Sequence, residues 1–456
     1  MRIYLGNCWS RLSGSTPELE QSLAVAHDGY WYNERYKAGL WDGKTHFLKI
    51  PSLVFPSGLL GFVEDHFRST GEAYEIIDER KKVEIDESAW PETFSGLLHG
   101  IDLRPYQEEA IATAMCCERG CFEMATGSGK TEVAAGIIRL LSRPTLFLVH
   151  TLDLLRQTSA RFSLRLGRPV GRFGGGEEVD SDVVVATVQT ISEWLKRSPR
   201  FAKAWLSRFE VLFLDESHHA SASTWYRIAM STPRAFFRYG LSGTVLRRDD
   251  VSNMKMMAAL GGLIYELPAH ELIAQGHLSK IKVNLISNPT IVPASASTKW
   301  ATVYREGVVR SDWRNRKIVE IARQASSSGG RTLILVRQIE HGEILRQLLG
   351  EDVVFLSGSD SSLMRGEMVE EFEGGKRSIL IASTIFDEGV DIPSINTLII
   401  AAGGKSEIRT IQRIGRGLRK KEGGEALEVY DFLDRGKFLA RHSALRKETY
   451  EKERFL

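Results

Sequence analysis

The segment Ala125-Thr126-Gly127-Ser128-Gly129-Lys130-Thr131 decides the fold of this 456-residue chain. It follows an apolar run expected to form a strand, Cys121–Met124, and precedes a run with helical character, Glu132–Leu141. Closely spaced glycines let the backbone wrap so that successive N–H groups converge on an anion at a helix N-terminus. We therefore predict a phosphate-binding loop, in which Lys130 places a positive charge beside the phosphates and the Thr131 hydroxyl ligates magnesium. The other loop residues expected to bind the nucleotide are Thr126, Gly127, Ser128 and Gly129.

A second apolar run, Val211–Leu214, ends in the carboxylates of Asp215 and Glu216. In a phosphoryl-transfer site, Asp215 would hold magnesium through water, and Glu216 would orient and polarise the attacking water. Such a pair at a strand end could also form a solvated turn, so this interpretation depends on the phosphate-binding loop. His218 and His219 follow, but no other metal ligands lie at a suitable spacing, so we assign them non-metal roles.

Upstream of the loop, Gln107 lies in the segment Leu103-Arg104-Pro105-Tyr106-Gln107. Its side-chain amide offers both a donor and an acceptor, as the edge of an adenine requires. A role in capping a helix explains this glutamine equally well.

Outward from these segments, apolar runs alternate with helical stretches, which predicts a parallel sheet of βαβ units. The strand candidates of the first series are Cys121–Met124, Thr145–His150, Asp182–Ala186, Val211–Leu214 and Tyr239–Leu241. The rhythm recurs in a second series, with candidates Thr332–Val336, Val353–Leu356, Ser378–Ala382, Thr397–Ala401 and Ala426–Asp431. We therefore predict an α/β protein with two tandem parallel-sheet domains, 96–275 and 276–456, preceded by a small α+β domain, 1–95.

The second series carries Gln412-Arg413-Ile414-Gly415-Arg416-Gly417-Leu418-Arg419. Arg416 and Arg419 are three residues apart and so share one face of a helix. Guanidinium groups facing a γ-phosphate stabilise the charge that develops in phosphoryl transfer, an effect of roughly 10³–10⁵ in rate. Because these arginines are distant in sequence from Lys130, they would have to act from the opposite sheet. A basic surface stretch is the alternative, and the nearby segment 383–393 argues against it.

The ordered set of segments across residues 103–431 resembles the motifs of superfamily 2 helicases, whose two sheets are RecA-like. The resemblance makes Leu103–Gln107 the adenine-reading motif, which adds Arg104 to the nucleotide contacts. It makes the loop at 125–131 motif I and Asp215–His218 a DExH-type motif II. Ser383–Asp391 resembles motif V, which implies roles at the nucleotide for Gly389 and Asp391. Gln412–Arg419 resembles motif VI, which gives catalytic roles to Gln412, Arg416 and Arg419.

The same resemblance implies a set of nucleic-acid contacts, although each residue alone could equally cap a helix or lie on the surface. Motors of this kind hold the sugar–phosphate backbone through hydroxyls, amides and scattered cations. The residues at the matching motif positions are Thr151, Gln157, Thr187, Gln189, Arg337 and Thr384.

Within the superfamily, two groups are closer. The segment Thr244–Asp250 is similar to the one after motif III in XPB-type DNA helicases, with Arg248 in place of the acidic middle residue of their RED triplet. The segments Lys37–Lys44, Phe55–Leu60 and Val429–Asp434 resemble those of phage UvsW-type branched-DNA helicases. These resemblances imply an ATP- and magnesium-dependent helicase or translocase on branched, forked or duplex DNA, with 3′ to 5′ movement.

Composition sets further limits. Hydrophobic residues make up 43% and charged residues 26% of the chain, as in globular proteins, and no apolar run is long enough to cross a membrane. A formal net charge of +2 means that a polyanion must be met by local basic patches. Three of the four cysteines crowd positions 116–121 without metal-site spacing, which favours a reducing cytosol. The resemblance to phage helicases implies the cytoplasm of a bacterium or of a phage-infected host.

The leading 95 residues leave two interpretations open. Arg35, Lys37, Lys44 and Lys49 interleave with Tyr32, Tyr36 and Trp41, which suits a DNA duplex or junction. A small aromatic core explains the aromatic residues equally well. For the whole chain, the competing functions are an RNA helicase, the DNA translocase of a restriction system, and an ATP-gated clamp without motor activity. We expect a monomer or a component of a recombination or replication assembly.

Overall fold

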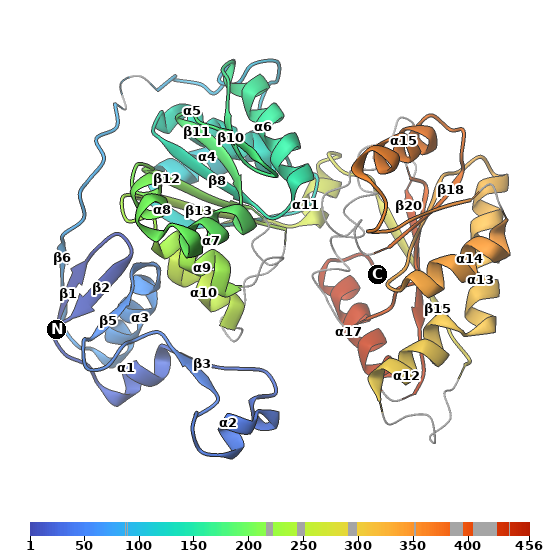
Figure 1. Ribbon diagram of the computed structural model, residues 1–456, viewed down its shortest axis with the longest axis horizontal. Coiled ribbons are helices and arrows are strands. Elements are labelled where there is room, and N and C mark those ends of the chain that lie inside the picture. The colour runs from blue at the N-terminus through green and yellow to red at the C-terminus, as the bar shows by residue number, and fades with distance from the viewer. Residues whose placement is uncertain are drawn as a thin grey trace. The chain divides into compact units, whose positions relative to one another are not determined.

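The apolar runs of the first series form one eight-stranded sheet in the computed structural model (Figure 1). The structure describes residues 1–86, 88, 90–215, 222–243, 251–290, 299–350, 353–383, 395–404, 426–436 and 438–456. The chain divides into two compact units, one of residues 1–124 with 129–266 and the other of residues 125–128 with 267–456. The predicted domain boundaries near residues 95 and 275 stay predictions.

The first sheet confirms the predicted parallel α/β fold. Its strands, in spatial order, are β10 (Glu177–Val179), β9 (Gly171–Gly174), β11 (Val183–Thr187), β8 (Thr145–Val149), β12 (Val211–Asp215), β13 (Phe237–Ser242), β7 (Arg119–Met124) and β14 (Leu263–Leu267). The pairs from β9 to β7 are parallel, and β10 joins β9 in an antiparallel hairpin. Its helices are α4 (Pro105–Cys116), α5 (Lys130–Leu141), α6 (Leu152–Leu166), α7 (Val188–Arg197), α8 (Pro199–Leu206), α9 (Ala222–Met230) and α10 (Val251–Leu260).

A second, six-stranded sheet is parallel throughout. Its strands, in spatial order, are β15 (Ile281–Ser287), β20 (Leu427–Leu433), β19 (Thr397–Ile400), β16 (Thr332–Leu335), β18 (Ile379–Ala382) and β17 (Val354–Leu356). The helices of this unit include α11 (Ala269–Ala274), α12 (Trp300–Tyr304), α13 (Asp312–Ser327), α14 (Ile339–Leu349), α15 (Ser362–Glu373) and α17 (Leu439–Lys452). All five strands predicted for the second series are confirmed, each within two residues of its expected ends.

The C-terminal helix α17 is fixed to β20 by a buried ion pair. Arg446 contacts the Asp431 carboxylate at 2.7 Å, and the Tyr450 hydroxyl donates to the same carboxylate at 2.6 Å. Burial alone would raise the pKa of Asp431, but the charge and hydrogen bonds of Arg446 outweigh it and hold this pKa below its usual range. Because either charge alone would be buried without compensation, the pair fixes the position of α17.

The leading residues form a small α+β layer of four strands, in the order β5 (Val54–Pro56), β2 (Trp9–Leu12), β1 (Arg2–Leu5) and β6 (Glu75–Asp78). Helices α1 (Pro17–Ser22) and α3 (Leu60–Thr70) accompany this sheet. Its apolar core, including Phe55 and Phe67, continues directly into Met254, Met257 and Ala258 of α10. The leading layer and helix α10 therefore share one hydrophobic core.

A buried guanidinium strengthens this junction. Arg238 of β13 is fully buried and donates to the carbonyl oxygens of Ala235 and Thr232 and to Cys8 Sγ at 2.8, 2.6 and 3.0 Å. Nearby, Arg119 donates to the Asn7 carbonyl at 3.1 Å, and burial lowers the pKa of Arg119 to about 9. The leading layer is thus attached by polar contacts as well as by apolar packing.

Among the described residues, none of the helices combines the length and the apolar composition that crossing a bilayer requires.

Candidate functional site

The carboxyl ends of three neighbouring strands bring the two predicted nucleotide segments to one edge of the first sheet. Strand β13 lies between β12 and β7, and all three run parallel. In register, Asp215 pairs with Leu241, and Leu241 pairs with Phe122. Asp215 and the loop that leaves β7 at Met124 therefore lie at the same edge of the sheet.

The loop itself has the backbone conformation that its glycines permit. Gly127 and Gly129 have φ values of 85° and 83°, in the left-handed region that favours glycine. Gly129 is the N-cap of α5, so the loop ends where the helix presents its first N–H groups. Positive φ at both glycines lets the chain turn at the positive end of a 12-residue helix, where an anion is favoured. The residues present therefore fit a nucleotide phosphate.

Two side chains of the first turn of α5 complete this end of the loop. The Lys130 ammonium donates to the Met124 carbonyl at 3.1 Å, which keeps it beside the end of β7. Thr131 follows it in the chain and is half-buried. A lysine, a threonine hydroxyl and the Asp215 carboxylate form a donor set suited to polyphosphate with magnesium.

Gln107 caps a helix, which is one of the two roles that the sequence suggested for it. It is buried, and its amide oxygen accepts from the Arg104 N–H at 2.9 Å, which caps α4. The amide nitrogen lies close to the loop, because a Cβ added to Gly129 would come within 2.3 Å of it. Arg104 donates to the Tyr106 hydroxyl at 2.8 Å. A contact of Gln107 or Arg104 with adenine stays a prediction.

The sequence analysis missed a buried carboxylate beside the loop. Glu132 is 4% exposed and accepts from Arg161 of α6 at 2.9 Å, while Arg165 lies at 3.7 Å from the same oxygen. This contact fixes the first turns of α5 against α6. The available signal was an acidic residue directly after Lys130-Thr131 on a helix face that is otherwise apolar.

Replacing Gly129 with alanine is expected to weaken ATP binding about tenfold. A side chain in the left-handed region costs roughly 1–2 kcal/mol, and the added Cβ would displace Gln107. Titration of a fluorescent ATP analogue measures the effect. Gly61→Ala is the matched control, because this exposed glycine of α3 has open space around its Cβ position. Unchanged affinity in Gly129→Ala would contradict the nucleotide role of the loop.

Several predicted site residues lie outside the described residues, and their roles stay predictions. They are Glu216, Thr384, Gly389, Asp391, Gln412, Arg416 and Arg419.

Two of the predicted nucleic-acid contacts, Thr151 and Thr187, lie at the carboxyl ends of β8 and β11. Thr151 caps α6 by accepting from the Leu154 N–H at 3.2 Å, and Thr187 caps α7 by accepting from the Thr190 N–H at 3.4 Å. The register Thr187 to Val149 makes these two helix N-termini neighbours. Side chains that could bind phosphates thus also serve as helix caps, and paired helix N-termini favour anions in their own right.

The remaining described members of this set, Gln189, Gln157 and Arg337, are all exposed. Gln189 donates to the His150 carbonyl at 2.9 Å, which ties α7 to the end of β8. Gln157 is exposed on α6. In the other unit, Arg337 is exposed after β16, with its guanidinium 5.8 Å from the centre of the Tyr304 ring. Nucleic-acid binding by all of these residues stays a prediction.

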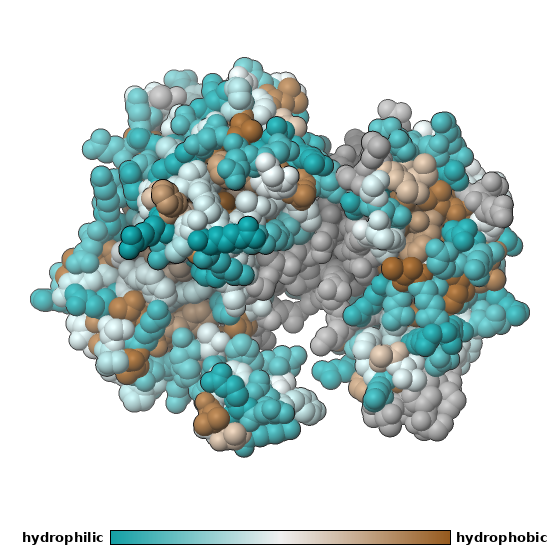
Figure 2. All heavy atoms as spheres, in the orientation of Figure 1, coloured by the Kyte–Doolittle hydropathy of each residue, from teal (hydrophilic) through white to brown (hydrophobic). Residues whose placement is uncertain are grey.

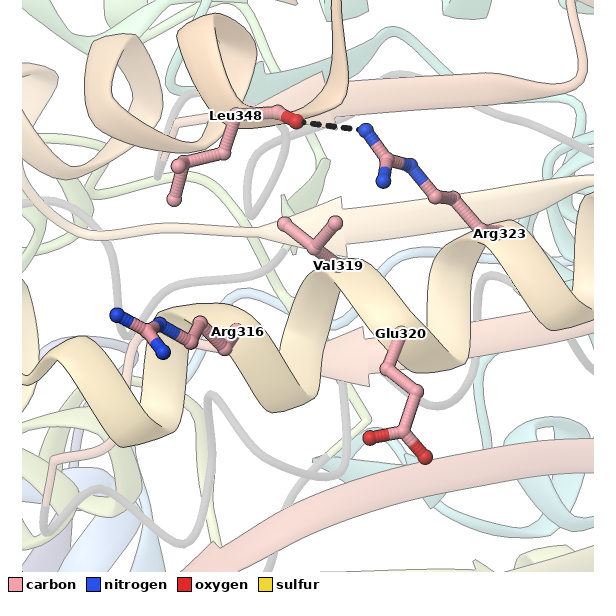
Figure 3. A pocket seen from close by; sticks show the side chains of 5 residues that line it. All are labelled: Arg316, Val319, Glu320, Arg323 and Leu348. Carbon is pink, nitrogen blue, oxygen red and sulfur yellow. Dashed lines mark hydrogen bonds between the residues drawn. The ribbon is translucent and has the colours of Figure 1, made fainter.

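A separate groove lies on the second unit and contains none of these residues (Figure 3). It has a volume of about 520 Å³ and lies between α13 and α14, where Arg323 donates to the Leu348 carbonyl at 2.9 Å. Its other lining residues are Arg316, Val319 and Glu320. Since its walls are long, solvated side chains, we assign it no part in nucleotide chemistry.

Comparison with known proteins agrees with this arrangement. Residues 100–247 match the family described as "Type III restriction enzyme, res subunit", and residues 313–421 match "Helicase conserved C-terminal domain". The chain is 26% identical over 446 residues to the ATP-dependent DNA helicase uvsW of Enterobacteria phage T4, which covers 91% of this chain and 86% of that protein. It is 27% identical over 410 residues to the DNA 3′-5′ translocase XPB2 of Sulfurisphaera tokodaii, covering 81% and 90%.

Among solved structures, the fold is similar to that of Dbp5 from S. cerevisiae bound to RNA and ADP BeF3. The TM-score is 0.54 at 15% sequence identity, with 80% of this chain and 94% of that chain covered. The two family matches follow the order of the two parallel sheets along the chain. The chain is therefore a superfamily 2 helicase-type protein with two RecA-like domains, of the group that includes UvsW and XPB.

Proposed function

We propose that this protein is an ATP-dependent DNA helicase or translocase that moves along DNA and remodels branched or forked structures. The observation that carries the proposal is the left-handed glycine loop on α5, at the same sheet edge as Asp215. The names of its relatives support DNA as the track, because they describe a DNA helicase and a DNA 3′-5′ translocase. The second name also supports 3′ to 5′ movement.

The residues divide the chemistry in the following way. The loop N–H groups and Lys130 bind the phosphates, and Thr131 and Asp215 hold magnesium, which neutralises charge on the polyphosphate when bound. Glu216 holds and polarises the attacking water. Arg104 and Gln107 select the base. In the second half, Gln412, Arg416 and Arg419 assist hydrolysis, and Gly389 and Asp391 contact the nucleotide.

Movement requires that the two halves of the motor respond differently to ATP and to its products. Thr151, Gln157, Thr187 and Gln189 grip the DNA backbone from the first RecA-like domain, and Arg337 and Thr384 grip it from the second. Because these groups bind sugar and phosphate rather than base edges, the grip is independent of sequence. A cytoplasmic site of action, in a bacterium or a phage-infected cell, belongs to the same proposal.

An ATPase panel tests this function. We expect little hydrolysis without nucleic acid, strong stimulation by forked and four-way DNA, and weaker stimulation by linear duplex and by RNA. Displacement of streptavidin from a biotinylated 3′ or 5′ end then tests movement and its direction. Stronger stimulation by RNA would favour an RNA helicase. Nucleotide-dependent DNA affinity without displacement would favour an ATP-gated clamp, and preference for long linear duplex would favour a restriction-type translocase.

A further inference from the structure

A segment that projects from the leading layer has aromatic side chains that are not part of the hydrophobic core of this layer. We define the aromatic hairpin as residues 27–46, which follow the short strand β3 (Ala24–Ala26) and end with its antiparallel partner β4 (Lys44–His46). Every residue from 31 to 40 is exposed. Trp31, Tyr32 and Leu40 are 50%, 75% and 72% exposed. The core of the layer uses other residues, so the small-core interpretation of these aromatic residues is wrong.

The aromatic hairpin stands out from the sheet and helices of its layer (Figure 1), and that end of the molecule has apolar surface directly beside strongly hydrophilic surface (Figure 2). A contiguous patch of exposed apolar residues marks a binding site more often than scattered single exposed residues do. The exposed aromatic rings of the hairpin favour a binding partner with flat surfaces that can cover them.

Internal contacts hold the exposed rings in place. Tyr30 is half-buried and meets Trp31 and Tyr36 edge to face, with ring centroids 5.2 and 4.7 Å apart. A Cβ on Gly43 would lie 2.3 Å from the Tyr30 ring, so Tyr30 packs directly on the Gly43 backbone. Trp41 donates its indole N–H to the Lys44 carbonyl at 2.8 Å. Tyr30 and Trp41 thus support a platform on which Trp31, Tyr32 and Tyr36 remain open.

Three cations of the aromatic hairpin could contact a polyanion. Arg35, Lys37 and Lys44 are exposed, and within the described residues none of them forms an ion pair. Asp42, in contrast, is engaged with His46 at 2.6 Å, and this hydrogen bond lowers the pKa of Asp42. Asp28, Glu34 and Asp42 balance these three positive charges, so the formal net charge of residues 27–46 is zero with neutral histidines. The cations therefore lie beside the rings and are available for phosphates.

The aromatic hairpin is attached at both ends to the first RecA-like domain, so we expect the two to move together. Strand β3 contributes Val25 to the core shared with α10, and Phe47 and Leu48, directly after β4, lie in the same core. Both ends of the hairpin are thus anchored in the body that holds Lys130.

We propose that the aromatic hairpin stacks on unpaired bases at the branch point of forked DNA, with Arg35, Lys37 and Lys44 on the adjacent phosphates. Exposed rings gain little from a continuous duplex, whose bases are already stacked on each other, whereas a branch point offers free base faces. Stacking on an aromatic side chain is open to every base, because every base has a π-face. The inference rests on the proposed function and identifies the branch point as the DNA structure that the leading layer contacts.

The test compares binding of full-length protein to forked DNA and to blunt linear duplex of the same length. The double variant Trp31→Ala/Tyr32→Ala is expected to lose about tenfold in affinity for forked DNA, which is about 1.4 kcal/mol, and little for blunt duplex. Trp31→Phe/Tyr32→Phe should retain fork affinity, since it keeps ring faces. The matched control is Phe201→Ala, which removes a 75% exposed aromatic residue of α8.

Stacking also has a spectroscopic signature. A 2-aminopurine at the branch point should change its fluorescence on binding the unaltered protein and respond far less to the alanine double variant. Equal fork preference in the alanine double variant, with DNA-stimulated ATPase intact in the unaltered protein, would overturn the stacking proposal alone. Absence of DNA-stimulated ATPase in the unaltered protein would instead overturn the proposed function. A double variant that changes sedimentation mass but not fork affinity would make the hairpin a protein interface and overturn the inference.

Discussion

Lys130→Ala is expected to reduce the DNA-stimulated ATPase rate by about 10²–10³-fold, the effect of removing one positioned donor from developing transition-state charge. Lys130 lies in the first turn of α5, with its ammonium held 3.1 Å from the Met124 carbonyl at the end of β7. No other residue of the loop segment carries a positive charge. The variant therefore loses the point charge while the loop keeps its N–H groups.

The measurement is the steady-state ATPase rate with saturating forked DNA. Lys203→Ala is the matched control, because it removes an exposed lysine of α8 and should hydrolyse ATP at the parental rate. The melting temperature of Lys130→Ala shows whether loss of the contact with Met124 disturbs the domain. A well-folded variant with full ATPase activity would mean that the glycine loop does not bind the nucleotide phosphates.

The sequence predicted both parallel sheets because their strands are continuous apolar runs. All five residues of β8 and all five of β11 are buried. Strands are buried along their whole length in this way when helices cover both faces of the sheet. The hairpin of β9 and β10 was missed because Gly171, Gly174, Gly175 and Gly176 make this region look like a loop. Strand β15 was missed because four of its seven residues are only half-buried, so its apolar run is weak.

The candidate site was predictable at positions where both phosphate binding and the backbone conformation require the same residue type. Gly127 and Gly129 belong to that class, since both adopt positive φ. Spacing could not reveal local use of polar side chains, because helix caps depend on three-dimensional proximity to free N–H groups. Gln107, Thr151 and Thr187 all have such a capping role in addition to their predicted contacts.

The shared core between the leading layer and α10 was also beyond the sequence. Met254, Met257 and Ala258 are ordinary helix residues, and nothing in their order tells that they pack against Phe55 and Phe67 some 190 residues earlier. The same limit applies to the aromatic hairpin. Composition could not separate buried from exposed rings, and only the fold shows that the core of the layer is complete without them.

Arg416→Ala is expected to leave ATP binding near the parental value and to reduce turnover by about 10³-fold or more, since a guanidinium that acts on the transferring phosphoryl group contributes roughly 10³–10⁵ in rate. The two steps separate because such an arginine interacts more strongly with the transition state than with bound ATP. Titration of a fluorescent ATP analogue gives the affinity, and single-turnover hydrolysis of radiolabelled ATP gives the rate. Arg419→Ala should show the same pattern.

The competing interpretation of this segment, a basic surface stretch, predicts a different result. It makes Arg416 equivalent to its charged neighbours Lys420 and Lys421. Alanine variants of Arg416, Lys420 and Lys421 should then lower DNA affinity by similar, modest factors. Their turnover at saturating DNA should be the same. Comparing Arg416→Ala with Lys420→Ala at saturating DNA therefore decides between the two. A thousandfold loss confined to Arg416 and Arg419 supports a role in phosphoryl transfer, whereas equal, salt-dependent losses across all four positions would reduce the segment to a DNA-binding surface.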